Sequence, residues 1–204
     1  MIISENEQQS DGWFEDRLGL PTASNFSKIV TSKGVASKSQ EEYRYLLASE
    51  IISGNKGVNY TNKDMERGNE LEPKARALYE FTNNVDVQEV GLCWKDETKR
   101  FGASPDGLVG KDGLIEIKCC RPEKVIECLD KGVPPKAYSM QQIQGQLLVS
   151  GRVWCDLWVY AEGLPPYCQR IMRNEVFVRL LENELALFCD KLDILVEKIK
   201  QRRT

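Results

Sequence analysis

The sequence predicts an α/β (α+β) fold in which a central mixed β-sheet is flanked by helices. Runs of β-branched and apolar residues, typical of strands, lie in the middle of the chain, and segments with helical apolar spacing lie on both sides of them. A chain of 204 residues is long enough for one well-filled core and short for two. We therefore expect residues 1–204 to form a single domain.

Five helices are expected. One begins at Ser39, which has capping-box spacing with Glu42, and ends near Gly54. A second covers residues 64–82, with a weak point at Pro73. Three more are predicted over residues 123–129, 137–149 and 174–200.

The predicted strands are arranged around a hairpin. Residues 85–94 and 100–104 are expected to form two adjacent strands separated by a polar turn. Residues 108–109 and 114–118 flank Gly110-Lys111-Asp112-Gly113, which has the form of a glycine-flanked hairpin turn. A further strand is expected over residues 153–160.

The composition limits the chemistry. The sequence contains no histidine, which excludes Ser-His and Cys-His catalysis and the usual zinc sites. Its seven cysteines lack a CxxC pair, so neither a disulfide framework nor a zinc knuckle is indicated. The net charge of −3 and the pI near 5.3 argue against non-specific coating of nucleic acid, because such binding depends on neutralising phosphates. Hydrolysis must therefore use carboxylates, lysine and hard metal ions.

Nothing in the sequence suggests a membrane protein. No stretch approaches the roughly 18 apolar residues that a membrane-spanning helix needs. Residues 1–10 are polar and acidic, unlike a secretory signal. We expect a cytoplasmic protein with no membrane partner.

One string of residues carries the chemistry: Asp106 before the predicted hairpin, and Glu116-Ile117-Lys118 in its second strand. Residues two apart in a strand share a face, so Glu116 and Lys118 point the same way, and the hairpin returns the chain beside Asp106. Acidic oxygens and the Ile117 carbonyl would form a hard oxygen site that suits Mg²⁺ or Mn²⁺. Lys118 could orient the nucleophile or take its proton. The alternative is a surface hairpin with scattered charges, because a D…ExK string often arises by chance.

Further motifs lie before and after this string along the sequence. They are Trp13 with Arg17-Leu18-Gly19, Thr22-Ala23-Ser24, Gly68-Asn69-Glu70-Leu71-Glu72-Pro73-Lys74-Ala75, Ser104-Pro105-Asp106-Gly107, and Tyr138 with Gln142 and Gln144. Together they resemble the lambda exonuclease (YqaJ-type viral recombinase) branch of the PD-(D/E)xK nuclease superfamily, over residues 13–151. The resemblance implies a restriction-endonuclease-like core and makes residues 1–204 a single exonuclease domain.

The resemblance also implies a metal site. Asp106, Glu116 and the Ile117 carbonyl would bind metal, and Glu72 would complete or support the metal cluster. Lys118 would position the attacking water. Two Mg²⁺ ions are expected, and Mn²⁺ is expected to substitute for them.

Gln142 would help to hold this site, although Gln141 and Gln144 are alternatives for the same position. Without the family resemblance, the glutamines at 141, 142, 144 and 146 would be interpreted as a solvated helix face.

A binding site for the 5′-phosphate of DNA is implied as well. Arg17 and Ser24 match the family positions associated with that phosphate, and Ser104 could add a hydroxyl contact. An arginine fork suits a terminal phosphate. Trp13 is expected to pack in the core rather than to contact DNA.

The implied function is alkaline-type 5′→3′ exonuclease activity on double-stranded DNA ends. The enzyme would release 5′-mononucleotides and leave a 3′ single-stranded overhang for recombination by strand annealing. A toroidal homotrimer, a single-strand annealing partner and a phage or prophage origin are expected from the family. The alternatives are a structure-dependent endonuclease of the same superfamily and a non-catalytic DNA-binding protein. An iron–sulfur nuclease is disfavoured because the cysteines lack closely spaced pairs.

Overall fold

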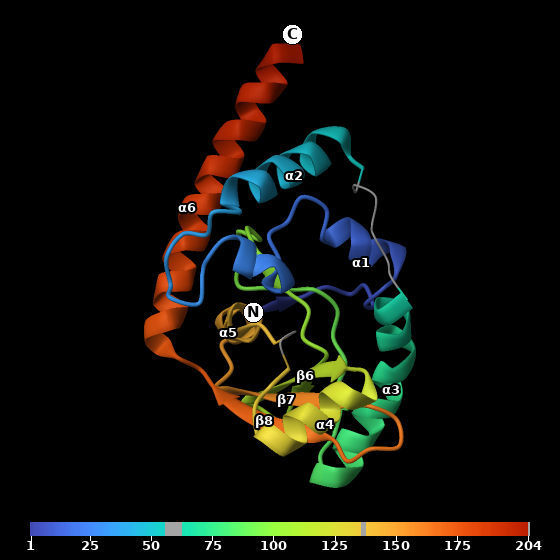
Figure 1. The fold of residues 1–204 in the computed structure, drawn as a ribbon. Coiled ribbons are helices and arrows are strands. Elements are labelled where there is room, and N and C mark those ends of the chain that lie inside the picture. The colour runs from blue at the N-terminus through green and yellow to red at the C-terminus, as the bar shows by residue number, and fades with distance from the viewer. Residues whose placement is uncertain (56–62, 136–137, 204) are drawn as a thin grey trace.

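A computed structural model describes residues 1–55, 63–135 and 138–203, and its mixed α+β arrangement confirms the predicted fold class (Figure 1). The helices are α1 (Asp11–Asp16), η1 (Ala23–Lys28), α2 (Gln40–Ser53), α3 (Lys63–Asn83), α4 (Pro122–Lys131), α5 (Met140–Ser150), α6 (Glu175–Lys200) and η2 (Gln201–Arg203). The strands are β1 (Ile2–Ile3), β2 (Val87–Gln88), β3 (Cys93–Trp94), β4 (Gly102–Ala103), β5 (Gly107–Val109), β6 (Gly113–Cys119), β7 (Trp154–Tyr160) and β8 (Tyr167–Met172). They form a five-stranded sheet, β2-β5-β6-β7-β8, and a three-stranded sheet, β1-β3-β4.

The centre of the larger sheet is the parallel pair β6 and β7, whereas the other pairs of that sheet are antiparallel. Side chains of both central strands alternate between two apolar clusters. Leu114 and Leu157 belong to the cluster that includes residues of α2, α5 and α6. Ile115, Ile117 and Trp158 belong to the cluster that includes residues of α3. Even-numbered positions of β6 therefore face α5, and odd-numbered positions face α3.

The helices largely match the predicted ranges. The α3 helix continues through Pro73, so the expected weak point does not interrupt it. The α2 helix ends at Gly54, whose φ of 68° permits a left-handed cap. The predicted capping box is wrong: Ser39 is the N-cap, but its backbone is helical (φ −83°, ψ −1°) and its side chain forms no capping hydrogen bond. The predicted start at Ala137 lies outside the described residues, and α5 begins at Met140.

Two features of the sheets differ from expectation. The segment predicted as one strand over 85–94 is divided between the two sheets, as β2 and β3. Between them, the carbonyls of Val90 and Leu92 accept hydrogen bonds of 2.8 Å from Gln8 and Ser4, so the N-terminal segment satisfies this backbone. Strand β8, which was not predicted, is an edge strand. Its mostly exposed residues lack the alternation of a half-buried strand.

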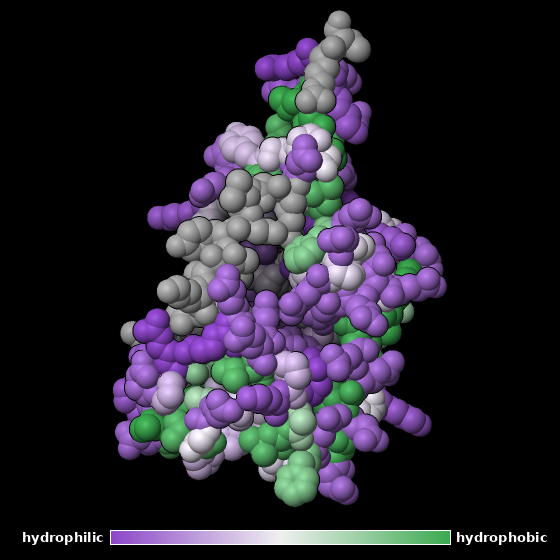
Figure 2. Space-filling model, turned by 90° about the vertical axis from the view of Figure 1, so that its right-hand side faces the viewer, coloured by the Kyte–Doolittle hydropathy of each residue, from purple (hydrophilic) through white to green (hydrophobic). Residues whose placement is uncertain are grey.

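None of the helices within the described ranges combines the length and the apolar character needed to cross a bilayer. The face shown in Figure 2 is mostly hydrophilic, with hydrophobic residues in separate patches.

Candidate active site

The hairpin formed by β5 and β6 brings the first acidic residue to the other two charged groups. Gly107 pairs with Ile115 in the antiparallel ladder, so Asp106 lies just before the end of the paired region. The Ile117 backbone amide donates a hydrogen bond of 2.6 Å to Asp106 Oδ2. This contact fixes the Asp106 carboxylate against the backbone of β6 at the residue between Glu116 and Lys118.

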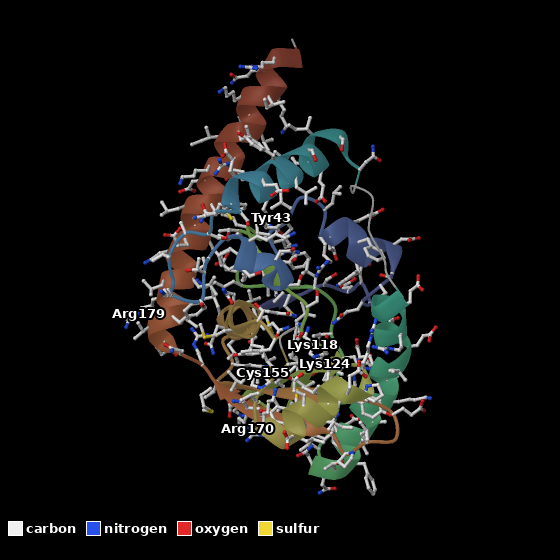
Figure 3. The ribbon with its side chains drawn as sticks, viewed as in Figure 1. Tyr43, Lys118, Lys124, Cys155, Arg170 and Arg179 are labelled. Atoms are coloured by element: carbon white, nitrogen blue, oxygen red, sulfur yellow. The ribbon has the colours of Figure 1, made fainter. Side chains whose placement is uncertain are left out.

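Glu116 is a charged side chain in the apolar layer under α5, with an exposed fraction of 2%. Its Oε1 lies 2.6 Å from the Lys118 ammonium and accepts a 2.7 Å hydrogen bond from Gln142 Nε2. Its Oε2 accepts a 2.6 Å hydrogen bond from Gln146 Nε2. The carboxylate is thus compensated by one ion pair and two amides, as a buried charge requires. Figure 3 shows Lys118 near the middle of the molecule.

Glu72 reaches the same region from α3. Arg76, one helical turn later, lies 2.6 Å from Glu72 Oε1 and 2.7 Å from Glu89 Oε2. The Arg76 Nε also donates to the Asp106 carbonyl at 3.3 Å. Arg76 therefore connects the Glu72 carboxylate to the main chain of Asp106.

The electrostatics of the site show an excess of negative charge. Burial, followed by repulsion from Glu116 and Glu72, raises the pKa of Asp106 well above its usual range. Burial also raises the pKa of Glu72, against the opposing effect of Arg76. The charge of Glu116 raises the pKa of Lys118. A bound cation would relieve the repulsion among these carboxylates.

The donor groups fit a hard divalent ion, because they are carboxylate oxygens. Among the described residues, however, no three acidic or cysteine side chains form a ready-made metal cluster. In this arrangement the Lys118 ammonium is the counter-ion of the Glu116 carboxylate. Ile117 contributes its amide to Asp106, and the use of its carbonyl as a metal ligand stays a prediction.

A second group of polar residues surrounds the guanidinium of Arg17. Arg17 donates to the hydroxyls of Ser104 and Thr22 at 3.1 and 3.4 Å, and its guanidinium lies 4.2 Å from the centroid of the Trp13 ring. Trp13 Nε1 also donates to Ser104 Oγ, at 3.0 Å. Ser24 joins this group through a 3.3 Å contact between its hydroxyl and that of Thr22. Within the described ranges no carboxylate forms an ion pair with Arg17, so its charge is available to a ligand.

Both groups line one cavity of about 530 Å³. Arg17, Ser24 and Ser104 contribute to its wall, and so do Glu72 and Asp106. The cavity therefore places a cationic fork and a group of carboxylates where one bound molecule could contact both.

One expectation about these residues is corrected, and one alternative interpretation is excluded. Trp13 is half-buried in the cavity wall rather than in the core, because its indole N–H is used by Ser104. The glutamines of α5 do not form a solvated face. Gln141, Gln144 and Gln146 are all buried, and Gln142 is half-buried.

Two contributors to the site were not identified from the sequence, namely Arg76 and Gln146. Each lies four residues after a residue that was identified, Glu72 and Gln142 respectively, and on the same helix. Side chains four apart share a helix face, so this spacing was a usable signal.

Comparison with known proteins shows which folds and which family this chain resembles. An alkaline exonuclease (LHK-Exo) from Laribacter hongkongensis superimposes with a TM-score of 0.85 at 37% identity, covering 95% of this chain and 98% of that chain. Its complex with dAMP gives a TM-score of 0.84. A phage-related exonuclease from Haemophilus somnus shares the fold, with a TM-score of 0.69 at 16% identity, covering 88% of this chain and 96% of that chain.

An uncharacterized protein of Acanthamoeba polyphaga mimivirus is 28% identical over 168 residues, which are 76% of this chain. This chain spans 29% of the length of that protein. The family model of the YqaJ-like viral recombinase domain matches residues 12–153, which include the β5–β6 hairpin, Glu72, Arg17 and all of α5. The chain belongs to the YqaJ-like viral recombinase domain family.

Proposed function

We propose that this chain is a Mg²⁺-dependent 5′→3′ exonuclease that acts on the ends of double-stranded DNA and releases 5′-mononucleotides. The observation that carries the proposal is the single cavity shared by Arg17, Ser104, Glu72 and Asp106. A terminal phosphate held by the arginine fork would place the first linkage of the strand beside the carboxylates. The 37% identical relative is an alkaline exonuclease, and its complex with dAMP adds support, because dAMP belongs to the product class proposed here.

Each residue has a defined role in this proposal. Asp106, Glu116 and Glu72, with the Ile117 carbonyl, would hold two Mg²⁺ ions, which Mn²⁺ could replace. Bound metal would lower the pKa of a water and offset charge on the phosphodiester. Lys118 would orient the attacking water, and its ion pair with Glu116 already fixes the ammonium at the site.

At the metal site, Gln142 would keep the Glu116 carboxylate in place through its 2.7 Å hydrogen bond. Arg17, Ser24 and Ser104 would bind the 5′-phosphate. Because these contacts involve the phosphate and no base, they would set the position of the strand without sequence preference.

We further propose that the 3′ overhang is used in recombination by strand annealing. The family resemblance supports a toroidal homotrimer, a single-strand annealing protein as partner, and action in the cytoplasm of a bacterium that carries the phage or prophage. The net charge of −3 is compatible with DNA binding if positive potential is confined to a channel.

The test uses linear duplexes with 5′-phosphate or 5′-hydroxyl ends and a closed circular duplex, each incubated with Mg²⁺. The wild-type protein is compared with Glu116→Ala and with Glu97→Ala, a matched control at an exposed position between β3 and β4. Products are separated by ion-exchange chromatography.

We expect mononucleotides from the linear 5′-phosphorylated duplex, an intact circle, and loss of activity only in Glu116→Ala. Cutting of the circle would favour the endonuclease alternative over the exonuclease. Full activity of Glu116→Ala would reject the site.

A further inference from the structure

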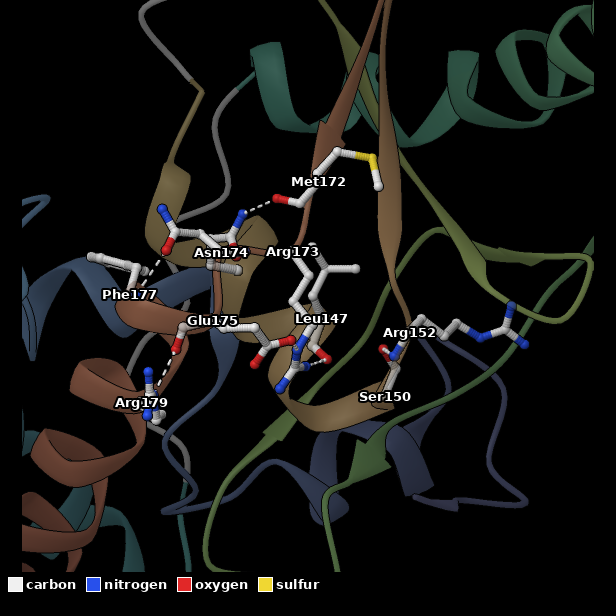
Figure 4. Close-up of polar contacts among 10 residues, drawn as sticks. Leu147, Ser150, Arg152, Met172, Arg173, Asn174, Glu175, Phe177 and Arg179 are labelled. Atoms are coloured by element: carbon white, nitrogen blue, oxygen red, sulfur yellow. Dashed lines mark hydrogen bonds and ion pairs between the residues drawn. The ribbon is translucent and has the colours of Figure 1, made fainter.

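Helix α5 carries several buried glutamines, and one of them is used differently from the others. Gln141 Nε2 donates to the Val30 carbonyl at 3.1 Å. Gln144 Nε2 donates to the Met172 carbonyl at 2.9 Å, and its Oε1 accepts from the Asn174 amide at 2.8 Å. These contacts connect α5 to neighbouring backbone, and Figure 4 shows this region, including the bond from Arg173 to the Leu147 carbonyl.

Gln146, by contrast, donates to a charged side chain, Glu116, at 2.6 Å. Its exposed fraction is 1%, and its Oε1 is buried with no hydrogen-bond partner among the described residues. A buried acceptor without a partner is unfavourable, and most native structures avoid it. The amide has only one other orientation, which would direct Oε1 at the Glu116 carboxylate and cause repulsion. The hydrogen bond to Glu116 Oε2 therefore fixes the orientation of the Gln146 amide.

The hydrogen bonds of Glu116 show how the Gln146 amide constrains the Glu116 carboxylate. Oε1 already has two partners, Lys118 and Gln142, whereas Oε2 has one within the described residues, Gln146. A carboxylate offers about four acceptor positions, so one position on Oε2 remains open. Gln146 and Gln142, one helical turn apart, hold the two oxygens from the same helix and so fix the plane of the carboxylate.

We propose that Gln146 is a positioning residue for cation binding: it holds the Glu116 carboxylate in one orientation, with an acceptor position of Oε2 directed away from α5. The proposal rests on the metal site of the proposed function, and Gln146 acts only through Glu116. Partners of metal ligands typically change metal affinity by about 10–100-fold when they are removed. Gln146 belongs to that class of partner, whereas Gln144 and Gln141 do not.

The experiment measures Mn²⁺ binding directly, by electron paramagnetic resonance, in the absence of DNA. Gln146→Met keeps the length of the side chain and removes the donor. Gln144→Met is the matched control, because it removes a buried amide of the same helix that contacts only backbone. Steady-state kinetics on a linear 5′-phosphorylated duplex give kcat and KM for each protein.

We expect Gln146→Met to bind Mn²⁺ about tenfold more weakly and to lose kcat, with KM for DNA unchanged. Gln144→Met should lower the melting temperature and keep the Mn²⁺ affinity of the wild type. Equal Mn²⁺ affinity in Gln146→Met and wild type would overturn the proposal, even if the variant were less stable.

A second variant keeps the test decisive if Gln146→Met does not fold. Gln146→Asn retains a buried amide but is one methylene too short to reach Glu116, and it should also bind Mn²⁺ more weakly. Wild-type affinity in this variant contradicts the role of Gln146 alone. If the wild-type protein itself binds no Mn²⁺, the proposed metal site fails, and the role of Gln146 fails with it.

Discussion

The Ile117 amide donates a 2.6 Å hydrogen bond to Asp106 Oδ2, and this bond links the two halves of the candidate catalytic motif. It holds Asp106 in a buried position beside two other carboxylates; burial raises the pKa of Asp106, and the charges of Glu116 and Glu72 raise it further. The repulsion among these carboxylates favours cation binding but lowers the stability of the metal-free protein, as is common at functional sites.

Asp106→Asn should therefore raise the stability of the metal-free protein and lower its nuclease activity. The amide oxygen can still accept from Ile117, while the repulsion from Glu116 and Glu72 disappears. In EDTA the melting temperature should rise, by about 2–4 °C for each kcal/mol relieved. Nuclease activity should fall about a hundredfold or more, equivalent to about 3 kcal/mol of transition-state stabilisation. A lower melting temperature in EDTA would contradict the electrostatic argument.

Arg17→Lys should reduce the preference for a 5′-phosphate. Lysine keeps the charge but cannot form the fork that reaches Ser104 and Thr22, nor stack on Trp13 in the same way. The ratio of rates on 5′-phosphate and 5′-hydroxyl duplexes should fall about tenfold. Arg179→Lys, at the outer edge of α6 in Figure 3, is the control and should keep the wild-type ratio. An unchanged ratio in Arg17→Lys would remove Arg17 from the phosphate site.

Gly145→Ala tests the close packing of α5 on η1. A Cβ at this position would lie 2.4 and 2.7 Å from atoms of the Phe26 ring, which is fully buried and cannot move freely. We expect a loss of about 1–3 kcal/mol in the free energy of unfolding, measured by urea denaturation. Gly68→Ala is the matched control, since nothing lies within 4 Å of its Cβ and α3 should gain about 1 kcal/mol. Equal effects of the two substitutions would contradict the packing argument.

Arg152 supports the hairpin that carries the site. Its Nη1 donates to the carbonyls of Val109, Gly110 and Gly113 at 3.3, 2.9 and 2.7 Å. Arg152→Ala should destabilise the protein by about 1–3 kcal/mol, because three turn carbonyls lose a charged donor. Hydrogen exchange should increase most in the amides of β5 and β6. An increase confined to other elements would show that Arg152 does not hold the hairpin.

Much of the fold followed from local sequence patterns. The hairpin has a glycine-flanked turn between two apolar runs, and α6 has a regular apolar spacing that begins just after the N-cap Asn174. The division of residues 85–94 between two sheets was not predictable, because Gln8 and Ser4, which bind the backbone there, are far away in the sequence. Strand β8 lacked a signal because an edge strand exposes most of its side chains.

The site could be predicted in part for the same reason. The hairpin geometry alone places Asp106 near Glu116 and Lys118, because the turn and the alternation of side chains along the strand are both local features. Arg76 and Gln146 depend on which face α3 and α5 turn toward β6, and that choice is made by tertiary packing. Composition could not distinguish Gln146 from the other glutamines of α5.

The most direct test of the metal site is an anomalous diffraction map from crystals of the wild-type protein soaked in Mn²⁺. The account predicts a Mn²⁺ peak between the carboxylates of Asp106 and Glu116, with Lys118 displaced from its ion pair or with the Glu116 carboxylate shared between Lys118 and the ion. A map with no peak at this position, or with Mn²⁺ bound only elsewhere, would contradict the account.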